Sequence, residues 1–264
     1  MIRRRAHPLW LAYLWLFFGF ILAPIAIVTI VAFQAPGFVA FPIEGFSFKW
    51  FEKALTYKPF LDSLVTSFQI ACLSTLLALL LGTPAALALA RRESRWADAI
   101  VTVLLSPLSV PLIVVGFALL FYLSRAGLGT SFIGLLLAHT LVGLPYIVRT
   151  VIAVYRTIGR EMEEAGRMLG ATRWQILRHV TLPLIRPGLL GGLLAFLISI
   201  DNLPVSYFFS SVSTVTLPVV MLSYIESSFD PSIAALSVIQ LAIALAGLLV
   251  IERVWGVRML SQSI

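Results

Sequence analysis

Six apolar stretches alternate with polar ones along the chain. Each is close to the roughly 20 residues that an α-helix needs to cross the hydrocarbon core of a bilayer. They predict spans at about 9–33, 64–90, 100–123, 132–148, 189–209 and 232–251. The pattern therefore predicts an all-α integral membrane protein with six transmembrane helices, and a single transmembrane domain over residues 1–264.

Prolines and two ionisable residues interrupt the apolar spans. The prolines expected to kink or break their helices are Pro24, Pro84, Pro111, Pro145 and Pro204. Membrane helices tolerate such breaks when neighbouring groups satisfy the freed backbone. Of the ionisable residues, His139 is expected to hydrogen-bond within the bundle, with a place on the transport path as the alternative. The other is Asp201.

A polar, arginine-rich loop at 156–187 separates the fourth and fifth spans. Its apolar periodicity predicts a helix that ends at Gly170, a residue suited to positive φ. Thr172 resembles an N-cap and predicts a second short helix, which Pro183 ends. Two short helices joined by a sharp turn suit docking in a partner's groove. The alternative is an interfacial helix lying on the lipid.

Basic residues indicate the orientation. Fifteen of the 19 lysines and arginines lie on one predicted face: Arg3, Arg4, Arg5, Arg91, Arg92, Arg95, Arg149, Arg156, Arg160, Arg167, Arg173, Arg178, Arg186, Arg253 and Arg258. The opposite face has Lys49, Lys53, Lys58 and Arg125. By the positive-inside rule, both termini and the 156–187 loop are cytoplasmic.

Composition agrees with a multi-pass protein in a plasma membrane. Of the residues, 60% are hydrophobic and only 12% are charged, whereas a soluble domain carries about a quarter charged residues. The net charge of +7 could suit nucleic acid, but the basic residues are not gathered on one domain, so no nucleic-acid partner is expected. The lone cysteine, Cys72, lies in an apolar run and indicates no disulfide.

The sequence lacks the motifs of nucleotide hydrolysis. A phosphate-binding loop needs a lysine in a Gly-x-x-x-x-Gly-Lys-Ser/Thr setting, and Lys49, Lys53 and Lys58 lack that context. We therefore expect no catalytic residue and no cofactor in this chain, with ATP and Mg²⁺ bound by a partner. The three scattered histidines indicate no metal site.

The stretch between Arg186 and Arg253 offers only negative charge. No lysine or arginine occurs between Arg186 and Arg253, while Asp201, Glu226 and Asp230 lie on or toward the external half. A path lined by carboxylates favours a cation. The alternative is that Glu226 and Asp230 are solvated loop residues.

A motif in the 156–187 loop resembles the EAA loop of bacterial ABC importer permeases. Glu164-Ala165-Gly166 is followed by Gly170 after three residues, and then by Val180 and Leu182-Pro183 at the family spacing. Gly166 stands in place of an alanine and Val180 in place of an isoleucine. Together with six predicted spans, the resemblance to type I, binding-protein-dependent importer permeases covers essentially the whole chain.

The resemblance implies how the chain works. Glu164, Ala165, Gly166, Gly170 and Ala171 would form the coupling helix, seated in a groove of an ATPase subunit dimer. ATP-driven closure of that dimer would switch the pore between inward-facing and outward-facing states. A periplasmic or extracellular binding protein would deliver the solute, and a second homologous permease subunit would complete the pore. Glu164 would pair with a basic or donor group on the ATPase or within the loop.

Three further segments are similar to spermidine/putrescine permeases: 197–206, 229–231 and 46–51. This resemblance implies a small cationic amine as solute and a heterodimeric pore. Candidate pathway residues are Asp201, Asn202, Tyr207 and Glu226. Asp201 would bind an ammonium group or, alternatively, satisfy backbone donors near Pro204. Permeases for opines, phosphonates, thiamine and ferric iron share parts of these segments, and a stand-alone secondary transporter is a weaker alternative.

Overall fold

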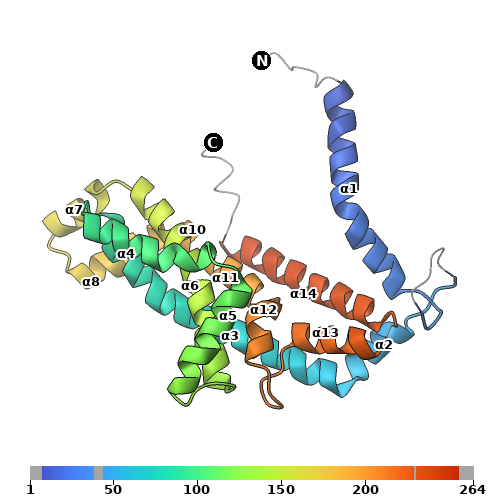
Figure 1. Cartoon of the computed structure of the whole chain (residues 1–264). Helices are drawn as coiled ribbons and strands as arrows, with labels where there is room; N and C mark the ends of the chain where they lie inside the picture. Colours follow the sequence, from blue (N-terminus) through green and yellow to red (C-terminus); the bar gives the residue numbers. More distant parts are fainter. Residues whose placement is uncertain (1–7, 39–43, 229, 256–264) are drawn as a thin grey trace. The chain divides into compact units, whose positions relative to one another are not determined.

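The computed structural model describes residues 8–38, 44–228 and 230–255, and these pack as two compact units. One unit combines Met1–Leu61 with Met221–Val254, and the other holds Asp62–Val220 (Figure 1). Helices α3 and α13 each run from one unit into the other. The basic residues Arg3, Arg4, Arg5 and Arg258 used for the orientation, and Phe229 of the polyamine-type segment, lie outside the described residues.

The first unit contains α1 (Pro8–Ala32), the short helix α2 (Lys49–Thr56) and α14 (Ser232–Trp255). Side chains of α1 from Leu9 to Val28 are exposed although almost all are apolar. A helix of this composition has no stable place in water, and its 25 residues match the thickness of a bilayer. A lipid environment therefore stabilises α1.

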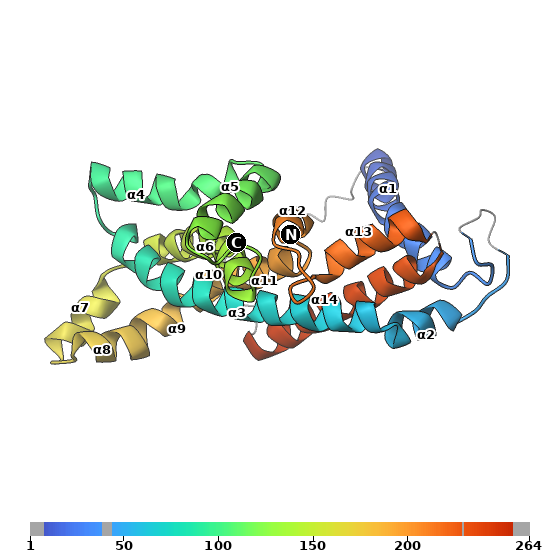
Figure 2. The ribbon, with the colours of Figure 1, turned by 60° about the horizontal axis from the view of Figure 1, so that its bottom comes forward.

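The second unit is built on α3 (Lys58–Ala90) and α6 (Phe132–Thr157), with α11 (Gly191–Ile200) packed on α6. Its core includes Ala78 and Ala86 of α3, Ile147, Val148 and Val151 of α6, and Ala195 of α11. Small side chains on α3 and α11 let the helices approach closely, which is the usual mode of packing in membranes. Figure 2 shows α7 and α8 at the end of this unit where α3 finishes.

The predicted third span is not one helix. It consists of α4 (Arg95–Leu105), a 3₁₀ turn (Ser106–Leu108) and α5 (Leu112–Arg125), and the chain bends by 106° between the two helical parts. Pro107 and Pro111 explain the break, because each removes a backbone donor and restricts the residue before it. Pro111 was expected to disturb the helix, but a turn of this size was not predicted.

Other helices differ from the predicted spans at their ends. The helix of the fourth span continues to Thr157 instead of ending near 148, because Val151, Ile152 and Tyr155 remain buried beyond the apolar stretch. Helix α3 begins at Lys58, earlier than 64. Pro24, Pro84 and Pro145 lie inside α1, α3 and α6 without ending them.

The predicted fifth span is also divided. Helices α9 (Leu182–Leu184), α10 (Arg186–Leu189) and α11 precede α12 (Leu203–Phe208), and the chain bends by 71° between Arg173–Leu184 and Arg186–Ile200. Helix α13 (Leu217–Ser227) follows. Pro187 and Pro204 occupy the first turns of α10 and α12, where the missing N–H is tolerated.

Within the described residues, three helices are long and apolar enough to cross a membrane: Leu9–Ala32, Lys58–Ala90 and Phe132–Thr157. The number rises to five if each of the two bent pairs is one span. The fold is thus an all-α membrane fold with three to five candidate spans.

Glycines bring the start of α11 against α6. A Cβ at Gly188 would lie 3.0 Å from the Val151 Cα, and one at Gly191 would lie 2.8 Å from the Tyr146 carbonyl oxygen. These are backbone atoms, which cannot move aside as a flexible side chain can. Gly188 and Gly191 therefore form a glycine-lined contact with α6.

We predict that Gly191→Ala lowers the free energy of unfolding by about 1–3 kcal/mol, because the added methyl group forces α11 away from α6. Thermal unfolding of the detergent-solubilised chain would measure the loss. Gly247→Ala is the matched control, since a Cβ at Gly247 meets no atom within 4 Å. Equal melting temperatures for the two variants would contradict the close packing at Gly191.

Candidate functional site

The EAA-like segment folds as two short helices joined by a tight turn. Helix α7 (Glu161–Met168) ends before Gly170, whose φ is +80°, and α8 (Arg173–Ile176) follows. Thr172 caps α8: its hydroxyl accepts from the Gln175 N–H at 3.3 Å, and its own N–H donates to Gln175 Oε1 at 2.7 Å. The predicted positive φ of Gly170 and the predicted N-cap at Thr172 are confirmed.

Large apolar side chains of this α7–α8 element (Glu161–Ile176) are exposed. Met168 is 91% exposed, Leu169 88% and Trp174 65%. Soluble surfaces rarely gather large apolar side chains in this way unless a partner covers them. The exposed face therefore has the character of a protein-binding surface.

Some of the predicted coupling residues are exposed, and others are partly buried within the element. Glu164, Ala165 and Gly170 are exposed, whereas Gly166 and Ala171 are half-buried. A Cβ at Gly166 would lie 3.3 Å from the Ile176 Cγ1, so a small residue there lets α7 pack against the buried Ile176. Packing against Ile176 therefore explains the small residue Gly166 at the third position of the motif. Glu164 and Ala165, at the first two positions, are exposed.

The structure adds a residue that the sequence reasoning missed. Glu163, and not Glu164, is the buried carboxylate of α7. Its Oε2 accepts from Arg91 Nη1 at 2.9 Å, and its Oε1 accepts from the hydroxyls of Tyr155 at 2.9 Å and Thr181 at 2.8 Å. The Arg91 guanidinium also lies over the Tyr155 ring, 4.0 Å from its centre. All of these partners belong to the second unit.

This network joins α7 to three other parts of the unit. Arg91 follows α3, Tyr155 lies near the end of α6, and Thr181 ends the π-helical turn Leu177–Thr181. Arg91 Nη2 also donates to the Ile158 carbonyl oxygen at 3.2 Å, which fixes the chain between α6 and α7. A displacement of α7 is therefore passed to α3 and α6 through hydrogen bonds rather than through a loose loop.

A second polar cluster surrounds the break between α11 and α12. Helix α11 ends at Ile200, and Asn202 Oδ1 accepts from the Val205 N–H at 3.0 Å to cap α12. Asn202 is buried, and its Nδ2 has no hydrogen-bond partner among the described atoms. Asp201 is exposed and lies between the two helices. Asn202 therefore satisfies one backbone donor in the first turn of α12.

His139 bridges the break from α6. Its Nδ1 lies 2.8 Å from Ser199 Oγ on α11, and its Nε2 lies 3.1 Å from Ser206 Oγ on α12. Ser199 Oγ is also 3.1 Å from Ser74 Oγ of α3. The ring is buried, which agrees with the expected hydrogen-bonding role within the bundle. His139 therefore holds the two helices on either side of Asp201 to a common support.

Of the other predicted pathway residues, Tyr207 is on α12 with a side chain 58% exposed, and Glu226 is an exposed residue of α13 in the first unit. Asp201 and Asn202 are consecutive residues at the break, Tyr207 follows on α12, and Glu226 belongs to the other unit.

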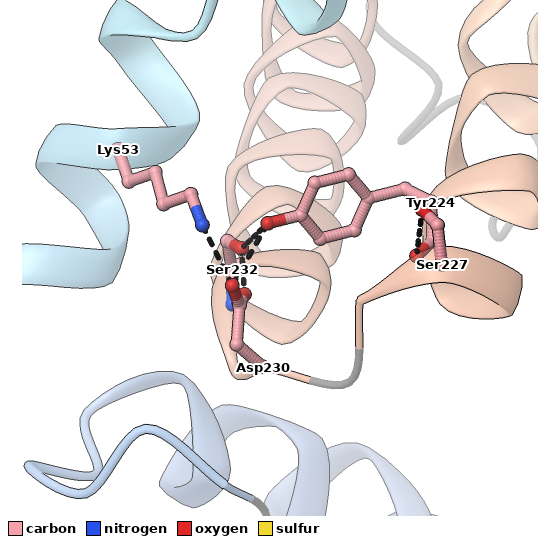
Figure 3. Close-up of polar contacts among 5 residues, drawn as sticks. All are labelled: Lys53, Tyr224, Ser227, Asp230 and Ser232. Atoms are coloured by element: carbon pink, nitrogen blue, oxygen red, sulfur yellow. Dashed lines mark hydrogen bonds and ion pairs between the residues drawn. The ribbon is translucent and has the colours of Figure 1, made fainter.

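Asp230 has a different role from the one expected of a free external carboxylate. Figure 3 shows Lys53 of α2 reaching it, and the Lys53 Nζ lies 2.6 Å from Asp230 Oδ2. The Tyr224 hydroxyl donates to the same oxygen at 2.8 Å, and the Ser232 hydroxyl and N–H bond the other. Burial would raise the pKa of Asp230, but these hydrogen bonds outweigh it and hold the pKa at about 2. The hydrogen bond to Asp230 raises the pKa of Lys53 in turn.

We predict that Glu163→Gln lowers the free energy of unfolding by about 1–3 kcal/mol, because it leaves the Arg91 guanidinium without its anion. Glu164→Gln, one residue along the same helix, is the matched control and leaves stability unchanged. Thermal unfolding of the solubilised chain compares the two. A larger loss for Glu164→Gln would show that the buried network does not hold α7.

Comparison with known proteins identifies the family of the chain. Residues 78–255 match the family model described as the binding-protein-dependent transport system inner membrane component. The spermidine/putrescine permease protein PotC of Haemophilus influenzae is 31% identical over 236 residues, which are 89% of this chain and 91% of that protein. The molybdenum permease protein ModB of Mycobacterium bovis is 33% identical over 234 residues, or 81% of this chain and 88% of that protein.

Solved structures show the same fold. A bacterial ABC transporter involved in the import of alginate superimposes with a TM-score of 0.67 at 17% identity, and 93% of each chain is covered. The MetNI methionine ABC transporter gives a TM-score of 0.62 at 19% identity, covering 74% of this chain and 93% of that one. The chain belongs to the inner-membrane permease components of binding-protein-dependent ABC importers, and is a membrane subunit rather than the ATPase.

Proposed function

We propose that this permease moves a small cationic amine, of the polyamine type, into the cytoplasm by alternating access. It would cross the membrane six times with both termini in the cytoplasm. Its partners would be an ATPase subunit dimer, a second and different permease subunit, and a periplasmic or extracellular binding protein. The similarity to spermidine/putrescine permeases supports the choice of solute.

The exposed carboxylate at the α11–α12 break carries the proposal. Asp201 lies between the end of α11 and the start of α12, in a stretch from 187 to 252 that has no lysine or arginine. A carboxylate in a membrane span is rare and is mostly kept for function. An ammonium group is the ligand that such a carboxylate binds most readily, since the two form a charge-assisted hydrogen bond.

Asp230 does not contribute to this attraction, because Lys53 already neutralises it. The remaining acidic residues of the last third that support a cationic solute are Asp201 and Glu226. The similarity to a molybdenum permease favours a metal oxyanion as the second candidate solute. The two candidates differ in the sign of the charge that Asp201 would meet, so one substitution separates them.

The coupling proposal rests on the α7–α8 element. Its exposed apolar face, with Glu164 and Ala165, would lie in a groove of the ATPase subunit. Closure of the ATPase dimer would move α7, and the Glu163 network would transfer that movement to α3 and α6. His139 lies on α6, so the α11–α12 break would follow. ATP and solute must bind the two states differently for the movement to be driven.

We predict that Gly170→Val greatly reduces assembly with the ATPase and solute-stimulated ATP hydrolysis, because a β-branched residue at φ +80° is strained and changes the turn. Gly127→Val is the matched control: Gly127 has φ +74°, and a Cβ at either glycine meets no atom within 4 Å. Co-purification and ATPase assays on the complete importer measure both effects. Equal losses in the two variants, or none in Gly170→Val, would refute the coupling role.

We predict that Asp201→Asn raises the KM for polyamine uptake about tenfold or more, since it removes one charge-assisted interaction. Complex assembly should be unchanged. Uptake of labelled spermidine into proteoliposomes that contain the complete importer measures the KM, with Asp62→Asn as the exposed Asp→Asn control. An unchanged KM would remove Asp201 from the binding site, and improved molybdate uptake would favour the oxyanion alternative.

A further inference from the structure

A cleft of about 770 Å³ opens in the second unit between two loops that are far apart in the sequence. One wall is the segment from Ala90 to Asp98, where α3 ends and α4 begins, and the other is the segment from Arg156 to Arg160, where α6 ends and α7 begins. Five arginines line it: Arg91, Arg92, Arg95, Arg156 and Arg160. The proposed coupling surface of α7–α8 does not use this cleft.

The cleft has an excess of positive charge. Against its five arginines stand two acidic residues, Glu93 and Asp98, so the lining has a net charge of +3 (five minus two). Neither acidic residue forms an ion pair with these arginines in the described part of the chain. A concave surface of one sign concentrates ions of the opposite sign.

The arginines differ in how far they are already engaged. Arg91 is bound to Glu163, Arg156 Nε donates to the Ala90 carbonyl oxygen at 3.1 Å, and Arg160 Nη2 lies 3.5 Å from the Arg91 carbonyl oxygen. Each of the latter two uses one of its five N–H donors in this way. The side chains of Arg92 and Arg95 are exposed and have no hydrogen bond or ion pair within the described residues. These two guanidinium groups are available to a ligand.

The position of the cleft points to the membrane surface. It lies where the apolar helix α3 ends, beside Trp96, which is 81% exposed. Tryptophan gathers at the level of the lipid headgroups, and arginine on the cytoplasmic side meets acidic headgroups there. The lining also includes the apolar Ala90 and Ile158, which suit the glycerol end of a lipid better than a fully hydrated ion.

We propose that this cleft binds the phosphate of an acidic glycerophospholipid from the cytoplasmic leaflet. Arg92 and Arg95 supply the donors, since a guanidinium group matches two phosphate oxygens in one plane. The engaged arginines Arg156 and Arg160 shape the opposite wall and add their charge. The proposal concerns a lipid site and is independent of the transported solute.

The test is a lipid titration of the purified full-length chain, followed by native mass spectrometry. Dioleoyl phosphatidylglycerol is compared with dioleoyl phosphatidylcholine, and Arg92→Gln/Arg95→Gln with the wild type. The expected result is preferential binding of phosphatidylglycerol, weakened about tenfold or more by the double substitution. Arg149→Gln, which removes an exposed arginine of α6 outside the cleft, is the matched control and leaves the binding unchanged.

Three outcomes would overturn the proposal. Equal weakening in Arg149→Gln would reduce the effect to general surface charge. Competition by inorganic phosphate at millimolar concentration, with the same dependence on Arg92 and Arg95, would make the cleft a site for a soluble anion. Loss of ATPase co-purification in the double variant, with unchanged lipid binding, would assign the arginines to the partner protein.

Discussion

The attachment of α7 to the membrane helices depends on the carboxylate of Glu163. Burying such a group is expensive unless its charge and lone pairs are satisfied, and here Arg91, Tyr155 and Thr181 satisfy them. Because these partners come from α3, α6 and the π-helical turn, one side chain fixes three parts of the chain at the same place. Removing any one of these partners would leave the remaining polar groups without a hydrogen bond. The intact network therefore resists displacement of α7 from the membrane helices.

Local chemistry explains what could be predicted from the sequence. The turn at Gly170 and the cap at Thr172 depend on single residues and their immediate neighbours, so the sequence was sufficient to predict them. The choice between Glu163 and Glu164 was not local. Adjacent residues on a helix point about 100° apart, and which one is buried depends on Arg91, 72 positions away. The spacing of the family motif draws attention to Glu164, whereas packing determines the role of Glu163.

Of the five prolines expected to disturb a span, Pro111 and Pro204 lie at helix breaks, whereas the other three lie inside continuous helices. The chain bends by 106° at the break that contains Pro111. At the break before Pro204, Asn202 caps α12, and His139 contacts a serine on each side. A buried network of this kind defines one geometry while it is intact. A change at the break must therefore move α6, or exchange hydrogen bonds with His139.

Counting charges along the sequence could not identify which carboxylates between Arg186 and Arg253 are already paired with a distant lysine. The absence of lysine and arginine between Arg186 and Arg253 drew attention to Asp201, Glu226 and Asp230, but Lys53 lies 177 positions from Asp230 and still neutralises it. The pKa of Asp230, about 2, shows that this carboxylate stays ionised because it is already bound. A cationic solute could use Asp230 only by displacing the Lys53 ammonium group from a carboxylate that two hydroxyls also bind. Under the proposed function, a cationic solute would therefore meet Asp201, which lies at the helix break where a moving helix would change the surroundings of the carboxylate.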